Sequence, residues 1–365
     1  MPTAAVMPAP RAPLELREFP EPELTDGAAL LETMFSEVCG TDVHLWHGRL
    51  SGVPYPIIPG HVSVGRITRM CGEIVDVEGE AFREGDIVAF MDVHGSCGHC
   101  YYCTVAKATT RCPERRVYGI TFSADEGLLG GWATHIWLKP GTRLLRLPEG
   151  LDPAVYIGGG CGLNTAFHAV ERADIAMGDT VAVQGAGPVG LSCVAFARLR
   201  GAGSVICLGA PAERLAIADE MGADATIDIS KRDESARRRE ILGLTHGRGA
   251  DVVIEATGHP GAVAEAMRFA RDQGRVVVCG QYTDAGSIEI NPHLDINRKH
   301  LDLRGCWGSD FSHFHRSILM LGRHHRDFAW HRLAERQYPL SQAQRALEDV
   351  EALRVPKAVI CPPRG

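Results

Sequence analysis

The sequence has no excess of positive charge. Its 38 lysine and arginine residues are outnumbered by 45 aspartate and glutamate residues, which gives a net charge of -7 and an isoelectric point near 6.1. Nucleic acids and anionic membrane surfaces attract basic patches, and the one compact basic run, at 237–239, lies among acidic side chains. We therefore expect neither a nucleic acid nor a membrane among the partners.

Long hydrophobic runs are also absent. No stretch approaches the ~20 uncharged apolar residues that a membrane-spanning helix needs, and residues 1–19 lack a basic segment followed by an apolar one. Internal repeats and low-complexity tracts are missing as well. We expect a cytoplasmic protein whose twelve cysteines are thiols or thiolates.

The pattern of apolar residues along the sequence changes near its middle. With 365 residues, the chain exceeds the roughly 250–300 residues at which a single core stops growing, so two domains are expected. Residues 1–155 have short alternating runs between turns rich in glycine and proline, which is typical of a β-rich barrel. Strands are predicted there at Gly65–Met70, Ile74–Val77 and Asp86–Phe90.

From about Tyr156, short continuous apolar runs alternate with longer helical segments. This alternation predicts a doubly wound parallel sheet, an α/β fold, because each crossover helix returns the chain to the same end of the sheet and the next strand then runs parallel to the last. The predicted strands are Thr180–Gln184, Ser204–Leu208, Asp251–Glu255 and Arg275–Cys279. A helix at Ser341–Leu353 and a strand at Lys357–Cys361 follow, in a tail expected to rejoin the first domain.

Four cysteines lie close together in the segment CGHCYYCTVAKATTRC, namely Cys97, Cys100, Cys103 and Cys112. Thiolates two residues apart can converge on one tetrahedral ion, and four of them close its coordination sphere. The pattern predicts a structural zinc site. A disulfide-bonded loop, or four buried thiols, is the alternative.

A glycine-rich turn follows the predicted strand Thr180–Gln184. It consists of Gly185, Ala186, Gly187, Pro188, Val189 and Gly190, and a helix-like run follows it. Strand, turn and helix in this order are typical of a dinucleotide-binding site, where the pyrophosphate meets the helix N-terminus. No carboxylate ends the next strand: Gly209 leaves room for a 2′-phosphate and Arg214 offers a counter-charge. This favours NADP slightly over NAD; alternatively, Gly209 only shapes the turn and Arg214 is a surface residue.

Three further segments hold zinc-ligand side chains beside flexible backbone: Cys39-Gly40-Thr41-Asp42-Val43-His44, Gly60-His61, and Gly158-Gly159-Gly160-Cys161-Gly162. In this order, with the four-cysteine loop and the glycine turn, they resemble the zinc-dependent alcohol dehydrogenases of the medium-chain dehydrogenase/reductase superfamily. The resemblance covers nearly the whole chain. It implies that Cys39, His61 and Cys161 hold a catalytic zinc, so that two zinc ions bind per chain.

The resemblance also implies roles for the neighbours of these ligands. Thr41 would bond the substrate oxygen, His44 would pass the proton to solvent, and Asp42 would orient the ring of His61. From spacing alone, the alternative is that His44 is a surface histidine. The sequence departs from the family at Val62, where a glutamate is usual, and this change predicts a more positive and less hydrated zinc site.

The fold implied is a GroES-like catalytic domain, 1–162 with 305–365, and an inserted Rossmann domain, 163–304. The function implied is reversible oxidation of an alcohol to a carbonyl with NAD(P), in a homodimer or homotetramer. Candidate pocket residues suit a bulky or cyclic secondary alcohol; they are Leu45, Trp46, His94, Trp307 and Phe311. The alternatives are a zinc- and nucleotide-binding protein without dehydrogenase activity, and a lyase or aldehyde-forming enzyme on the same scaffold.

Overall fold

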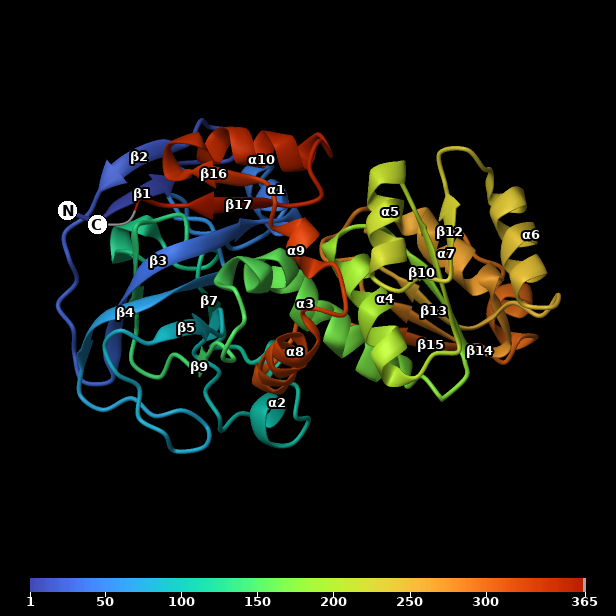
Figure 1. Cartoon of the computed structure of the whole chain (residues 1–365), viewed down its shortest axis with the longest axis horizontal. Helices are drawn as coiled ribbons and strands as arrows, with labels where there is room; N and C mark the ends of the chain where they lie inside the picture. Colours follow the sequence, from blue (N-terminus) through green and yellow to red (C-terminus); the bar gives the residue numbers. More distant parts are fainter. Residues whose placement is uncertain (364–365) are drawn as a thin grey trace. The chain divides into compact units, whose positions relative to one another are not determined.

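The computed structural model describes residues 1–363, which divide into two compact units (Figure 1). The first unit comprises Met1–Gly160, Asp310–His325 and the residues from His331 onward. The second comprises Cys161–Ser309 and Arg326–Trp330. No helix within residues 1–363 is both long and apolar enough to cross a membrane.

A seven-stranded sheet organises the first unit, with the strand order β16-β17-β3-β4-β5-β9 and with β8 also paired to β3. Its strands are β3 (Ala28–Val38), β4 (Ser63–Cys71), β5 (Ile87–Phe90), β8 (His135–Leu138), β9 (Leu144–Arg146), β16 (Gln337–Pro339) and β17 (Ala358–Cys361). Two small antiparallel pairs accompany it: β1 (Thr3–Val6) with β2 (Glu15–Glu18), and β6 (Val93–His94) with β7 (Arg116–Val117).

The C-terminal strand β17 lies antiparallel to β3, from the other end of the chain (Figure 1). Their register sets Val359 opposite Glu37 and Ala358 opposite Val38. Residues 357–361 are thereby fixed beside the end of β3, where the chain turns into the first helix. The helices of this unit are α1 (Gly40–Trp46), α2 (Tyr101–Thr104), α8 (Phe311–His324) and α10 (Ala343–Glu351).

Two helices include residues of both units: α3 (Pro153–Ala173) and α9 (Trp330–Leu333). Helix α3 is interrupted at Gly160, whose φ of 50° and ψ of -138° are not helical. Glycine adopts this conformation without the steric penalty that a Cβ atom brings. The interruption re-aims the chain directly before Cys161.

The second unit contains a six-stranded sheet in which every pairing is parallel, in the order β12-β11-β10-β13-β14-β15. Its strands are β10 (Thr180–Gln184), β11 (Ser204–Gly209), β12 (Ala225–Asp228), β13 (Ala250–Glu255), β14 (Ala270–Val278) and β15 (Asp302–Gly305). Its helices are α4 (Pro188–Arg200), α5 (Ala212–Glu220), α6 (Glu234–Leu244) and α7 (Pro260–Phe269). The order reverses between β10 and β13, and such switch points are where open parallel sheets bind ligands.

The predicted α/β fold with a β-rich part is confirmed, with one strand wrong. Residues 74–77 form no strand, and Val75 makes only an isolated bridge to Ala81. The Oδ1 atom of Asp76 accepts hydrogen bonds from the backbone N–H groups of Glu78 and Glu80, both at 2.9 Å. This local turn outweighs the alternating pattern.

Candidate metal centres and nucleotide-binding turn

Cys39 lies at the junction of β3 and α1, where it is the N-cap of the helix. Its sulfur accepts a hydrogen bond from Thr41 N at 3.3 Å, and its own N–H donates to Asp42 Oδ2 at 2.9 Å. Donors and partial positive charge at a helix N-terminus favour the thiolate form of a cysteine. The sequence CGTD therefore fixes a buried cysteine sulfur at the N-terminus of α1.

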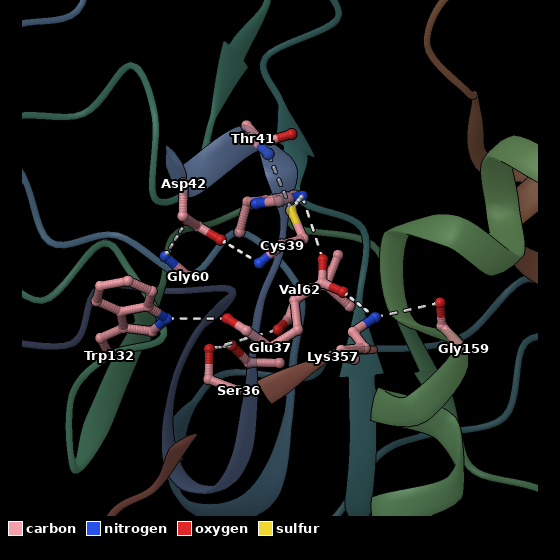
Figure 2. Close-up of polar contacts among 12 residues, drawn as sticks. Ser36, Glu37, Cys39, Thr41, Asp42, Gly60, Val62, Trp132, Gly159 and Lys357 are labelled. Carbon is pink, nitrogen blue, oxygen red and sulfur yellow. Dashed lines mark hydrogen bonds and ion pairs between the residues drawn. The ribbon is translucent and has the colours of Figure 1, made fainter. Parts of the chain in front are cut away.

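Asp42 is fully buried and has different partners from those expected. Its carboxylate accepts from the backbone N–H groups of Cys39 and, at 3.4 Å, Gly60 (Figure 2). Burial raises the pKa of Asp42 well above its usual value, and the Cys39 thiolate adds to the effect. Asp42 thus fixes the peptide before His61, while the ring atom Nδ1 of His61 is buried without a hydrogen-bond partner.

The sequence-predicted catalytic ligands come together. Cys39 Sγ, His61 Nε2 and Cys161 Sγ, together with a carboxylate oxygen of Glu37, lie within 4.8 Å of one another. The Cys39 Sγ to His61 Nε2 distance is 3.9 Å. The corresponding edge of a zinc tetrahedron is about 3.6 Å, from bond lengths of about 2.3 Å to sulfur and 2.0–2.1 Å to nitrogen. The donor set and its spacing therefore fit zinc.

The charges in this group are closely coupled. Burial lowers the pKa of His61, but the Cys39 thiolate and the Glu37 carboxylate outweigh it and raise the pKa well above its ordinary value. Several anionic groups around one buried imidazole favour the binding of a cation, and a divalent ion would neutralise them.

Thr41 and His44 lie on α1, directly after the predicted ligand Cys39. His44 is half-buried, and its Nδ1 atom is buried without a hydrogen-bond partner. Burial lowers the pKa of His44, with a contribution from the charge of Arg49. A histidine that is neutral at physiological pH can accept a proton, which agrees with the predicted relay role.

The four-cysteine loop also brings its side chains together. The sulfur atoms of Cys97, Cys100, Cys103 and Cys112 lie within 4.8 Å of one another, and none of the four forms a disulfide. Cys97 Sγ accepts from Cys100 N, and Cys112 Sγ accepts from Cys97 N, both at 3.3 Å. The disulfide alternative therefore does not hold here, and the four sulfurs fit a closed zinc site.

The thiols of this loop differ in acidity. A hydrogen bond from the His99 backbone lowers the pKa of Cys97 to about 6, whereas burial raises the pKa of Cys103 to about 12. Adjacent thiolates repel one another, so all four ionise together only around a cation.

The glycine turn joins β10 to α4. Gly185 has a φ of 109°, and a Cβ atom at Gly190 would lie 1.8 Å from the Gly185 oxygen. Gly187 is the N-cap of α4, Pro188 begins the helix, and Val189 and Gly190 complete its first turn. A Cβ atom at Gly187 would meet nothing within 4 Å, so space is open above the helix N-terminus. This arrangement suits a pyrophosphate group.

Gly209 and Arg214 were predicted to select NADP, and Gly209 also has a structural role that does not depend on the cofactor. A Cβ atom at Gly209 would lie 2.5 Å from Ala186 Cβ, so the glycine turn requires a glycine here whichever cofactor binds. Arg214 lies on α5, is partly buried, and has a pKa lowered by that burial. The absence of a carboxylate at the end of β11 is therefore the stronger indication.

The candidate pocket residues do not form one set. Leu45 is fully buried in the hydrophobic core of the first unit, and Trp46 packs against that core with its Nε1 donating to Ala12 O at 3.3 Å. Leu45 is therefore a core residue, and its selection for a substrate pocket is wrong. His94 lies edge-on to the ring of Tyr118 at 6.0 Å between centroids.

The other two candidates have other neighbours. Trp307 stacks on Tyr282 in the second unit, with ring centroids 5.7 Å apart. Phe311 begins α8 in the first unit and lines an open pocket of about 300 Å³ with Ile74 and Arg143. None of the residues lining that pocket is a predicted metal ligand.

Two residues beside the predicted catalytic ligands were not predicted from the sequence: Glu37 and Lys357. Glu37 Oε1 lies 3.2 Å from His61 Nε2, and Glu37 Oε2 lies 2.5 Å from Lys357 Nζ (Figure 2). A carboxylate two residues before the ligand Cys39 was a signal in the sequence. The lysine 320 positions later becomes its partner only through the pairing of β17 with β3.

Comparisons with known proteins agree with this architecture. A family model for the alcohol dehydrogenase GroES-like domain matches residues 25–149, and one for zinc-binding dehydrogenases matches residues 188–321. A 5-exo-hydroxycamphor dehydrogenase from Pseudomonas putida is 31% identical over 95% of both chains. Other relatives are named erythritol/L-threitol, L-threonine 3- and sorbitol dehydrogenases.

Solved structures are similar over the whole chain. An alcohol dehydrogenase from Thermotoga maritima superposes with a TM-score of 0.95 at 35% identity, over 99% of both chains. A protein described as a zinc-binding dehydrogenase from Sinorhizobium meliloti, solved bound to NADP, gives 0.87 at 27% identity over 99% of both chains. This chain belongs to the zinc-dependent alcohol dehydrogenases of the medium-chain dehydrogenase/reductase superfamily. It is an oxidoreductase that uses zinc and a nicotinamide cofactor to act on a small-molecule alcohol or carbonyl.

Proposed function

We propose that this alcohol dehydrogenase works at a zinc ion held by Cys39, His61 and Cys161, with a second, structural zinc in the four-cysteine loop. The observation that carries the proposal is the convergence of these three ligand atoms, which the sequence separates by up to 122 positions. The catalytic domain would comprise 1–162 and 305–365, and the nucleotide domain 163–304. A homodimer or homotetramer is proposed from family resemblance alone.

When bound, zinc supplies Lewis acidity that polarises the substrate oxygen. The chain's own residues manage the proton. The Thr41 hydroxyl would hydrogen-bond the alcohol and relay its proton toward His44, whose lowered pKa leaves it neutral and able to accept. Asp42 keeps Cys39 and the peptide before His61 in place through its two backbone bonds. A nicotinamide bound at the glycine turn would supply the hydride acceptor that oxidation of an alcohol to a carbonyl requires.

NADP is proposed as the preferred cofactor. The support is the absence of a carboxylate in the segment Gly209-Ala210-Pro211 that ends β11, together with Arg214 on the following helix. A carboxylate there would bond the ribose hydroxyls of NAD and repel a 2′-phosphate. The Sinorhizobium meliloti relative bound to NADP agrees with this preference.

A bulky or cyclic secondary alcohol is proposed as the substrate. The candidate pocket residues no longer support this choice as a set, so its support is the relative named for hydroxycamphor. The relatives named for polyols and threonine favour the opposite choice, a small polar alcohol. Comparing the oxidation of cyclic secondary alcohols with that of linear polyols decides between these two substrates.

The test is oxidation of a panel of alcohols by zinc-replete protein, with NAD and NADP compared for each. We expect the cyclic secondary alcohols to give a higher kcat/KM than linear polyols, with NADP preferred. The matched control is Cys161→Ser, which removes one proposed zinc ligand and is expected to remove turnover with every alcohol. Absence of turnover in the zinc-replete wild type would contradict the proposed function, and a polyol preference would contradict only the substrate.

A further inference from the structure

Glu37 is a completely buried carboxylate among the proposed catalytic ligands. Its exposed fraction is 0%, and one of its oxygens belongs to the same cluster as Cys39 Sγ, His61 Nε2 and Cys161 Sγ. Burying an ionised carboxylate is costly unless opposite charges and hydrogen bonds surround it. The neighbours of Glu37 must therefore offset the cost of burying its carboxylate.

The backbone of Glu37 is bonded to Val62, the position at which the family's usual glutamate is missing. Glu37 N donates to Val62 O at 3.1 Å, and Val62 is itself buried at 3% exposure. The two residues are neighbours across the start of the β3 and β4 pairing. A carboxylate that is missing at residue 62 is thus present on the adjoining strand.

Lys357 holds this carboxylate from the opposite side. Its Nζ atom is 2.5 Å from Glu37 Oε2 and 3.3 Å from Gly159 O, and its exposed fraction is 1% (Figure 2). The two carboxylate oxygens therefore face different partners. Oε2 meets the buried ammonium, while Oε1 faces His61 Nε2 at 3.2 Å.

Gly160 provides the space for this pair. A Cβ atom at Gly160 would lie 2.0 Å from Glu37 Oε2 and 2.2 Å from Lys357 Nζ. Both side chains are buried, so neither can swing into solvent to relieve the contact. The glycine segment before Cys161 thus serves the Glu37–Lys357 pair as well as the ligand.

We propose that Glu37 is the carboxylate of the catalytic metal site, supplied from β3 in place of residue 62 and held by Lys357. The inference rests on the proposed zinc ligands. The observed 3.2 Å between Glu37 Oε1 and His61 Nε2 is close to the nitrogen to oxygen edge of a zinc tetrahedron, about 3.3–3.4 Å.

Charge balance supports the same arrangement. A zinc ion with two thiolates and a neutral imidazole has no net charge, so an added carboxylate makes the buried site anionic. The Lys357 ammonium, itself almost completely buried, restores neutrality. A carboxylate at the metal and a buried lysine beside it are therefore expected together.

The alternative is that Glu37 and Lys357 form only a structural ion pair. Zinc release to a chelator separates the two explanations in the double variant Glu37→Gln with Lys357→Met, which leaves neither charge buried alone. If Glu37 acts at the metal, this variant releases the catalytic zinc at least about tenfold faster than wild type, the size of effect seen when groups supporting a metal ligand are removed. A rate within twofold of wild type overturns the inference.

Two controls accompany this measurement. The zinc of the four-cysteine loop lies on other residues, so its release rate serves as an internal reference and is expected to stay unchanged. Glu32→Gln makes the same substitution elsewhere on β3 and is expected to change neither rate.

Cobalt substitution gives a second readout that does not depend on activity. The ligand-field bands of the catalytic site are expected to change in the double variant, because a neutral amide replaces the anionic carboxylate donor, while the four-cysteine bands stay the same. Unchanged bands would overturn the inference. Absence of alcohol oxidation by wild type would instead contradict the proposed function, so the two failures are distinguishable.

Discussion

Replacing Lys357 by methionine tests the electrostatics of the site most sharply. The variant keeps much of the side-chain volume but removes the ammonium 2.5 Å from Glu37, leaving a carboxylate with 0% exposure and no buried counter-charge from the lysine. Breaking a buried ion pair by removing one partner typically costs about 3–5 kcal/mol. The metal-free protein should therefore lose roughly that much stability in the first unit.

The assay is urea unfolding of zinc-depleted protein, followed by near-ultraviolet circular dichroism. With a dependence of about 2–3 kcal/mol per M urea, the loss corresponds to a shift of about 1–2.5 M in the transition of the affected unit. Adding Glu37→Gln to Lys357→Met should restore most of the midpoint, because neither partner of the ion pair is then left buried alone. A shift below about 0.3 M in Lys357→Met, roughly 1 kcal/mol or less, would refute the reasoning.

Three further predictions concern other parts of the site. Burial lowers the pKa of His44, so in wild type the acidic limb of alcohol oxidation should lie below the ordinary histidine pKa of about 6.5. His44→Gln should remove this limb from a plot of kcat against pH, and an unchanged limb would exclude His44 as the proton acceptor. Gly190→Ala should weaken cofactor binding at least about tenfold in calorimetry, because its Cβ atom would meet the Gly185 oxygen at 1.8 Å, and equal affinity would contradict this packing. Cys103→Ser should release one zinc per chain and lower thermal stability while cofactor affinity persists, and full metal retention would argue against a four-sulfur site.

Much of the fold follows from local sequence patterns. The strand Thr180–Gln184 has the same bounds in the sequence prediction and in the structure, because a continuous apolar run ends at a glycine turn. Strands β12 and β15 were not predicted: β12 is a short run of mixed polarity, and β15 is mostly exposed. Burial on both faces is what makes a parallel strand visible in a sequence.

The proposed metal ligands were predicted from their order along the chain rather than from any one motif. Cys39 and His61 are each unremarkable alone, and only the structure brings their donor atoms to 3.9 Å. Asp42 was predicted to bond the ring of His61, but its carboxylate accepts a hydrogen bond from the backbone N–H of Gly60, the preceding residue. A side-chain partner cannot be read from spacing when both atoms lie on different elements.

Glu37 shows where the sequence alone was insufficient. The lack of a carboxylate at residue 62 was evident in the sequence, but its replacement depends on a hydrogen bond between Glu37 N and Val62 O across two strands. The stabilising lysine depends on the register of β17 against β3. Such pairings depend on non-local contacts, whereas local propensity describes only neighbouring residues.

The central claim is that Cys39, His61 and Cys161 hold a zinc ion that alcohol oxidation requires. The most direct test measures zinc content and alcohol oxidation together in wild type and in Cys161→Ala. The account predicts about two zinc ions per chain and turnover in wild type, and about one zinc ion and no turnover in the variant. A variant that keeps both zinc ions and oxidises alcohols at the wild-type rate would contradict it.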